Sequence, residues 1–226
     1  LNEFLGSGRL HSMMDMMRLQ MDQLSIPART LVPLLKDLAA GGPDVEWARR
    51  LLLDWDYVLD KNSVTAGIYA MWERRIQRNI EDLFVPENAR RLLRVGMKKS
   101  IDWLIAPPAE FGADPVAGRD EFLLRSLEEA VRDLRQQLGA NKDDWQYGQE
   151  RYKHALIRHP LSTAVNDELR RRLDVGPLPR GGNSYTVNNS GGGNNQTSGA
   201  SFRIIVDTED WDKAVGTNAP GQAGDP

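Results

Sequence analysis

The stretch SVTAGIYAMWERRIQRNIEDLF, residues 63–84, decides the fold class of this protein. Its apolar side chains recur at intervals of three and four residues, which places them on one face of an α-helix. These positions are Ile68, Met71, Trp72, Ile76, Ile80 and Leu83, while Glu73, Arg74, Arg75 and Arg78 fall outside the spacing. The stretch therefore predicts a long core helix.

Helical patterns continue on both sides of this stretch. Ser12 and Asp15 resemble a capping box at the start of a Met-rich helix, and Pro33 is expected to bend or break the next one. Gly96 is expected to interrupt a later helix, and Gly139 stands where a helix should stop. The predicted helices lie within residues 11–25, 27–38, 42–56, 86–108 and 119–139. Residues 141–176 are only weakly helical and end in GPLPRGG, a linker composition.

The character of the sequence changes after this linker. Residues 184–188 and 202–206 read as two strands flanking a loop rich in Gly and Asn. A lone hairpin is marginally stable in water, so these strands are expected to need further partners. We predict an α+β chain that is mostly α, with a helical subdomain over residues 1–176. Residues 177–226 are predicted to form a β-hairpin and a C-terminal segment of a core sheet.

Composition excludes several function classes. The 226 residues include 29 basic and 32 acidic side chains, and this slightly negative balance argues against nucleic acid or an acidic membrane as the main partner. Cysteine is absent, which excludes disulfides, Cys-ligated zinc and thiol nucleophiles. No apolar run approaches the roughly 18 residues of a membrane span. The first residues lack the features of a signal peptide, and the chain reads as if cut from something longer.

Few side chains suggest chemistry by themselves. The loop GGGNNQTSG, residues 191–199, lacks the Lys and the following helix that a phosphate-binding loop requires. The three histidines, His11, His154 and His159, are too scattered for a recognisable metal set. Ser7 could in principle become an N-terminal nucleophile after cleavage, but a helix rather than a strand is predicted to follow it. No catalytic, cofactor-binding or metal-binding residue is therefore assigned.

Several segments together resemble a known family. They are MMDMMRLQMDQLS, LLLDWDYVLDKNSVTAGIYAMWERRI, PRGGNSYTVNN, GASFRIIVDTEDWD and APGQAGDP. In this order they are similar to the later part of the β chain of the penicillin acylase family. The most specific pieces are Asp15-Met16, Leu19-Gln20, Asp22 and Ser25 in one helix, Asp54-Trp55-Asp56 with Tyr69 and Trp72 after it, and Pro220-Gly221-Gln222. The family contains N-terminal-nucleophile amidohydrolases, including penicillin, cephalosporin and acyl-homoserine-lactone acylases.

The resemblance implies an enzyme made from an exported precursor, and therefore periplasmic or secreted in a bacterium. In this family the β chain begins with a Ser that attacks the amide carbonyl, with its own α-amino group as base. That Ser, the oxyanion Asn and the calcium ligands would fall outside these residues. No cofactor is thus expected in this chain, and calcium only in the intact enzyme. The chain alone is expected to be inactive.

The resemblance also implies partners and a fold. The partners would be the α chain and the earlier part of the β chain, with a small-molecule amide as substrate, and neither nucleic acid nor membrane. The two predicted strands would join the family's αββα sandwich, and their open edges would favour self-association. Asn183 and Ser184, at the start of the first strand, are the only candidates for supporting the active site.

The expected function is hydrolysis of N-acyl amide bonds of the penicillin, cephalosporin or acyl-homoserine-lactone type, with a role in antibiotic biosynthesis. One alternative is a non-catalytic helical module that docks on a partner by strand addition. Another is a complete small hydrolase that uses Ser7 as its nucleophile.

Overall fold

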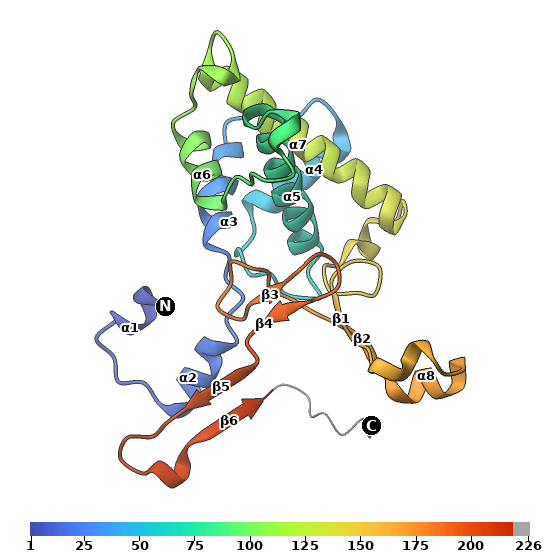
Figure 1. The fold of residues 1–226 in the computed structure, drawn as a ribbon. Helices are drawn as coiled ribbons and strands as arrows, with labels where there is room; N and C mark the ends of the chain where they lie inside the picture. The colour runs from blue at the N-terminus through green and yellow to red at the C-terminus, as the bar shows by residue number, and fades with distance from the viewer. Residues whose placement is uncertain (219–226) are drawn as a thin grey trace. The chain divides into compact units, whose positions relative to one another are not determined.

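The computed structural model describes residues 1–218, and contacts divide the chain into two compact units (Figure 1). The helical unit contains Ser25–Val58 and Asn62–Tyr147. The mixed unit contains Leu1–Leu24, Leu59–Lys61 and the chain from Gly148 onward. This grouping differs from the division at residue 176 that the sequence suggests, and that division stays a prediction.

The helical unit contains five α-helices within the described residues. They are α3 (Ile26–Leu31), α4 (Pro43–Leu53), α5 (Val64–Phe84), α6 (Met97–Ile105) and α7 (Pro115–Leu138). Short 3₁₀ turns at Val32–Leu35, Glu87–Ala89, Ala109–Phe111 and Lys142–Trp145 connect or extend them.

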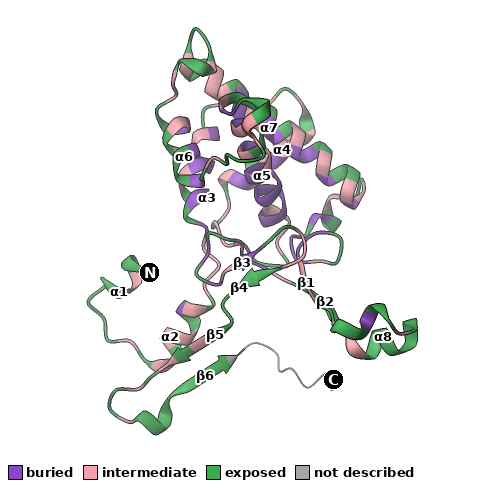
Figure 2. Cartoon of the chain, viewed as in Figure 1, coloured by how far each residue is buried: buried purple, intermediate pink, exposed green. Residues whose placement is uncertain are grey.

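Helix α5 is the centre of this unit, as its periodicity predicts, and it packs mainly against α7. Figure 2 shows α5 as largely buried, and the indole Nε1 of Trp72 donates to the carbonyl of Leu123 in α7 at 3.1 Å. Ser63 caps the helix by accepting a hydrogen bond from the backbone N–H of Ala66. The inward positions predicted for α7, Leu123, Leu127, Val131 and Leu134, are buried.

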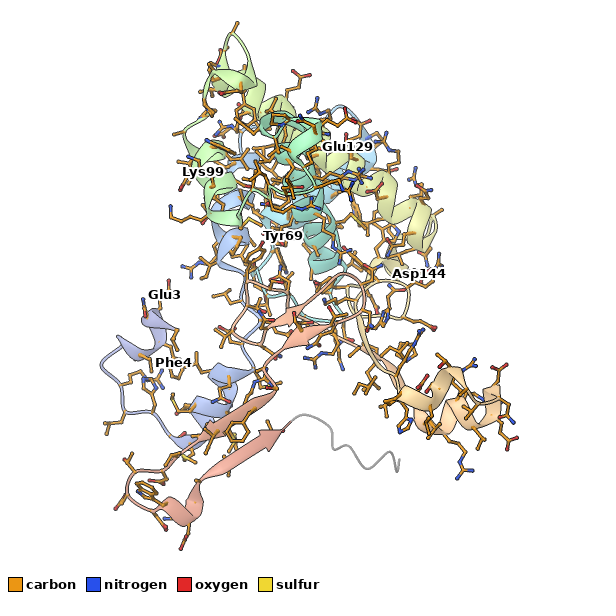
Figure 3. The ribbon with its side chains drawn as sticks, viewed as in Figure 1. Glu3, Phe4, Tyr69, Lys99, Glu129 and Asp144 are labelled. Carbon is orange, nitrogen blue, oxygen red and sulfur yellow. The ribbon has the colours of Figure 1, made fainter. Side chains whose placement is uncertain are left out.

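Two positions in α5 differ from the expected pattern. Leu83 is 40% exposed although it belongs to the apolar spacing. Glu73, expected outside the apolar face, is buried, because the hydroxyl of Tyr69 one turn earlier donates to its carboxylate at 2.7 Å. A hydrogen-bonded carboxylate can therefore occupy a position that polarity alone would place in solvent. Figure 3 labels Tyr69 in this unit.

Helix boundaries follow the predicted start and stop signals in most places. The capping box at Ser12 and Asp15 is confirmed. The second helix gives way to a 3₁₀ turn around Pro33, and Gly96 is the residue before α6. Helix α7 begins earlier than expected, because Asp114 accepts from the backbone N–H groups of Val116 and Ala117.

The mixed unit is built from short elements. Its helices are α1 (Asn2–Leu5), α2 (Met13–Gln20) and α8 (Asp167–Leu173), with 3₁₀ turns at Pro160–Thr163 and Trp211–Lys213. Up to Asn218, where the described chain ends, its strands form three antiparallel pairs: β1 (His154–Ile157) with β2 (Val175–Pro179), β3 (Ser190–Gly191) with β4 (Ser198–Gly199), and β5 (Phe202–Ile205) with β6 (Val215–Asn218). No helix within residues 1–218 has the length and apolar character needed to cross a membrane.

The predicted first strand of the hairpin is wrong. Residues 184–188 form turns, and β5 pairs instead with β6 in the same chain, with Ile204 opposite Gly216. Side chains explain the difference, because Asn183 and Thr186 hydrogen-bond to nearby backbone groups and offer the chain an alternative to a ladder. The second predicted strand is confirmed over residues 202–205.

The weakly helical region and its linker also require correction. Residues 154–157 are strand β1, and the predicted linker contains all but the first residue of its partner β2. This strand was not predicted because it contains Pro177 and Pro179, and proline is unfavourable inside a sheet. A two-stranded sheet leaves one edge of each strand open, and proline is tolerated at such an edge. The Gly-rich loop is likewise partly ordered, because it contains β3 and β4.

The chain therefore has an α+β fold that is mostly helical. Pro220-Gly221-Gln222 lies outside the described residues.

Candidate functional site

The two residues predicted to support an active site, Asn183 and Ser184, lie in a tight turn of the mixed unit. The side-chain Oδ1 of Asn183 accepts from the backbone N–H of Tyr185 at 2.8 Å, which forms an Asx-type turn. The backbone N–H of Asn183 donates to Oγ1 of Thr186 at 3.1 Å. Ser184 is exposed, and its carbonyl accepts from Nδ2 of Asn189 at 3.0 Å. Both residues are thus held by local hydrogen bonds.

This turn is attached to two other segments of the mixed unit. The backbone N–H of Asn188 donates to the carbonyl of Asp22 at 2.8 Å, and that of Gly182 donates to Leu59 at 2.8 Å. Gly182 has a φ of 68°, a left-handed conformation that glycine adopts without strain. The sequence GGN at residues 181–183 therefore places the Asx turn against the chain around residues 22 and 59.

A cluster of polar side chains lies beside the turn, and sequence reasoning missed it. Arg203 of β5 donates from Nη2 to Oδ1 of Asn188 at 2.9 Å, and Asn188 is only 1% exposed. Arg180, just after β2, donates from Nε to Oε1 of Gln196 at 2.8 Å. Gln196 Oε1 also accepts from the buried Ser190 hydroxyl at 3.4 Å. The only signal in the sequence was an arginine in each of two otherwise apolar or Gly-rich segments.

Burial changes the electrostatics of this cluster. Desolvation lowers the pKa of Arg180 from its ordinary value, and the nearby positive charge of Arg203 lowers it further. Within residues 1–218, neither arginine forms an ion pair with a carboxylate. In the described part of the chain, the charges of Arg180 and Arg203 are therefore hydrogen-bonded to neutral amides rather than paired with carboxylates.

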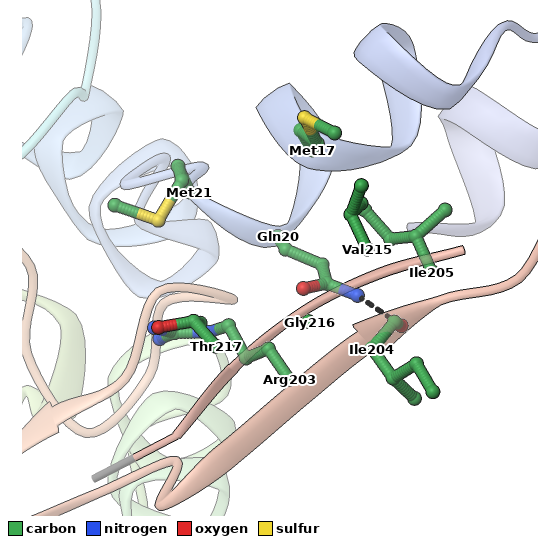
Figure 4. A pocket seen from close by; sticks show the side chains of 9 residues that line it. All are labelled: Met17, Gln20, Met21, Arg203, Ile204, Ile205, Val215, Gly216 and Thr217. Atoms are coloured by element: carbon green, nitrogen blue, oxygen red, sulfur yellow. Dashed lines mark hydrogen bonds between the residues drawn. The ribbon is translucent and has the colours of Figure 1, made fainter. Parts of the chain in front are cut away.

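An apolar pocket lies between α2 and the β5–β6 hairpin in the same unit (Figure 4). It has a volume of about 240 Å³, and the carboxamide of Gln20 donates to the carbonyl of Ile204 at 3.1 Å beside it. Its walls come from Met17, Gln20, Met21, Arg203, Ile204, Ile205, Val215, Gly216 and Thr217. This lining suits an apolar group, and Arg203 is the charged residue among those that line it.

The remaining candidate side chains do not converge. His11 stacks on Phe4, His154 begins β1, and His159 caps a 3₁₀ turn through its Nδ1. Ser7 is exposed between α1 and α2, and its hydroxyl accepts from the backbone N–H of Arg9 at 3.4 Å. Over residues 1–218, no group of three His, Asp or Glu side chains could hold a metal ion.

Comparison with known families identifies the class of protein. The penicillin amidase family model matches residues 1–226, the whole chain. The chain therefore belongs to the penicillin amidase family.

Two curated relatives are similar to this chain along nearly its whole length. Both are acyl-homoserine lactone acylases named QuiP, from Pseudomonas fluorescens and Pseudomonas aeruginosa. The first is 25% identical over 268 residues, covering 100% of this chain and 30% of the relative. The second is 24% identical over 274 residues, covering 99% of this chain and 31% of the relative. The chain thus spans about a third of the length of the relatives that it matches.

Proposed function

We propose that this chain is the later part of the β chain of an acylase that hydrolyses N-acyl amide bonds. The family match over the full 226 residues carries this proposal, and the two relatives named as acylases support it. The substrate would be a small amide of the penicillin, cephalosporin or acyl-homoserine-lactone type. The products would be a carboxylic acid and an amine.

The chemistry would require residues from other parts of the family polypeptide. An N-terminal Ser would attack the amide carbonyl, with its own amine as general base, and hydrogen-bond donors would stabilise the oxyanion. The α chain and the earlier part of the β chain would be the partners of this chain, which would be inactive alone. The assembled enzyme would be periplasmic or secreted.

Within this chain, Asn183 and Ser184 are the residues that we propose support the active site. Their turn is fixed by side-chain hydrogen bonds and attached to the chain around residues 22 and 59. A turn of this kind can hold a neighbouring catalytic segment in a productive position, as precise catalysis requires. The exposed side of Ser184 is the surface that would face that segment.

Amide hydrolysis by the native protein tests this proposal. The protein would be captured from its own cells with an antibody raised against the recombinant 226-residue chain. Both samples would then be assayed with a chromogenic phenylacetyl amide and with an N-acyl-homoserine lactone. We expect turnover by the captured protein and none by the recombinant chain.

The result separates the parts of the proposal. If the captured protein hydrolyses neither amide, the acylase assignment fails. If the recombinant chain is as active as the captured protein, the requirement for further segments is wrong.

A further inference from the structure

Arg180 and Arg203 of the mixed unit each have more N–H donors in the side chain than hydrogen bonds that the side chain makes to described residues. A guanidinium carries five N–H donors in a rigid fork. Arg180 donates to Gln196 and Arg203 donates to Asn188, one side-chain bond each, and neither meets a carboxylate within residues 1–218. Most of their donors therefore have no protein acceptor in the part of the chain that the structure describes.

Asn188 adds a third donor with no acceptor. Its side chain is 1% exposed, and its Nδ2 has no hydrogen-bond partner among residues 1–218. The amide cannot be reversed to correct this, because its Oδ1 accepts from Arg203 at 2.9 Å and an NH₂ group there would face another donor. A buried donor without an acceptor is costly and calls for an explanation, such as a missing ligand.

The positions of these groups are fixed by the same short segment. Arg203 contacts Asn188, whereas Arg180 contacts Gln196, whose Oε1 also accepts from Ser190. The backbone N–H of Arg180 donates to the carbonyl of Lys153 at 3.0 Å, and Nζ of Lys153 donates to the carbonyl of Gly193 at 3.0 Å. The side-chain partners of both arginines, Asn188 and Gln196, therefore lie in one short segment, residues 188–196. Burial and, secondly, the charge of Arg203 lower the pKa of Arg180. One anion bound between them would stabilise the charged form of both arginines, offsetting burial and the repulsion between the two positive charges.

We propose that Arg180, Arg203 and Nδ2 of Asn188 bind one oxyanion of the carboxylate or phosphate type. Guanidinium forks match the paired oxygens of both groups, and the amide of Asn188 supplies a further neutral donor. The oxyanion comes either from a dissolved small anion or from an acidic side chain in another segment of the family polypeptide. This site does not depend on the proposed acylase activity.

Arginine side-chain NMR tests this site directly. Signals of the guanidinium Nε–H groups would be followed in the recombinant chain during titration with sodium phosphate at pH 7. Sodium chloride at the same ionic strength would serve as the reference for screening. We expect saturable shifts of Arg180 and Arg203 with phosphate only, and sodium acetate as a second probe would show whether a carboxylate suffices.

Variants assign the binding to these residues. Arg203→Gln and Arg180→Gln should each weaken phosphate binding about tenfold or more, because each removes a charge-assisted donor pair. Arg171→Gln, in exposed α8, is the matched control and should leave binding unchanged. Arg203→Lys keeps the charge without the fork and should bind with intermediate affinity. If Arg203→Gln fails to fold, the phosphate affinity of Arg203→Lys tests the role of Arg203 instead.

Two further outcomes complete the test. Shifts that chloride reproduces would overturn the proposal. Phosphate affinity within twofold of the original in every Arg203 variant that folds would also overturn it. The longer native protein distinguishes the sources of the oxyanion. Phosphate binding there supports a dissolved anion, whereas loss of binding that the isolated chain retains supports an acidic side chain already in place.

Discussion

At the scale of single residues, Glu46 shows how local ion pairs set a charge. Its carboxylate accepts from Nε and Nη2 of Arg49 at 2.8 and 2.9 Å, and from Nε of Arg50 at 2.8 Å. These contacts, first those with Arg49 and then those with Arg50, lower the pKa of Glu46 from 4.5 to about 2. Helix α4 therefore keeps a charged carboxylate in its first turn, where the helix dipole also favours it.

The lowered pKa of Glu46 predicts a pH dependence of stability. A carboxyl with a lower pKa in the folded state contributes stability above its unfolded pKa, and loses it as the pH falls through the folded value. The contribution should therefore be complete above about pH 4.5 and lost towards about pH 2. Urea unfolding of Glu46→Gln across this range should show a smaller loss than the original chain. Glu128→Gln, at an exposed site on α7 that forms no ion pair with any described residue, should match the original.

Thr186 gives a prediction for the candidate site. Its buried hydroxyl accepts from the backbone N–H of Asn183 and donates to the carbonyl of Asn188 at 3.0 Å. Thr186→Val keeps the volume but leaves these groups without partners, and should lower the free energy of unfolding by about 1–3 kcal/mol. Thr186→Ser keeps the hydroxyl and should recover most of this loss in chemical denaturation. Equal stability of the Val variant and the original would show that the hydroxyl does not hold the turn.

At the scale of elements, helix α5 owes its close packing to Gly67. A Cβ at this position would lie 2.1 Å from the carbonyl oxygen of Trp145, in the 3₁₀ turn Lys142–Trp145. Such a distance forces the backbone to move, so the small side chain permits the approach. Trp145 is itself fully buried, and its Nε1 donates to the carbonyl of Gly139 at the end of α7.

Gly67→Ala should therefore destabilise the helical unit. Alanine gains up to about 1 kcal/mol in helix propensity, but the overlap with Trp145 should cost more, for a net loss of about 1–3 kcal/mol. Gly41→Ala, where a Cβ meets no atom within 4 Å, is the control and should change stability by less than about 0.5 kcal/mol. Thermal unfolding of both variants by circular dichroism measures the difference. A neutral Gly67 variant would contradict the close packing.

The helices could be predicted from the sequence better than the strands. Helices α5 and α7 could be predicted because their apolar faces and caps are encoded within each helix, at Ser63 and Leu127 for example. Strands β1 and β2 could not, because they are short and their pairing joins residues about twenty positions apart, with two prolines in β2. Residues 184–188 alternate like a strand, yet the side chains of Asn183 and Thr186 hold them as turns. The arginine cluster was missed because its members meet only after these turns form.

At the scale of the whole molecule, apolar surface remains on the β5–β6 hairpin. Phe202 and Ile204 lie on one face of β5 and are 58% and 49% exposed. Ile205, on the other face, lines the pocket beside α2, and Ile204 also contributes to its wall. Each strand of a two-stranded sheet also has an open edge, which can pair with another chain.

The exposed hairpin predicts that the isolated chain self-associates. Light scattering after size exclusion should give a mass above that of a monomer at micromolar concentrations. Ile204→Lys should shift the protein towards the monomer, because a charge on this face opposes association. Val116→Lys, at an exposed apolar position of α7, is the control and should not change the mass. A monomer at all concentrations would contradict this expectation.

The central claim is that the chain forms part of the β chain of a penicillin amidase family acylase. The most direct test is the intact mass and N-terminal sequence of the native polypeptide that contains these residues. Our account predicts a polypeptide much heavier than 25.4 kDa that begins with Ser. A native mass of 25.4 kDa with Leu1 at the N-terminus would contradict it.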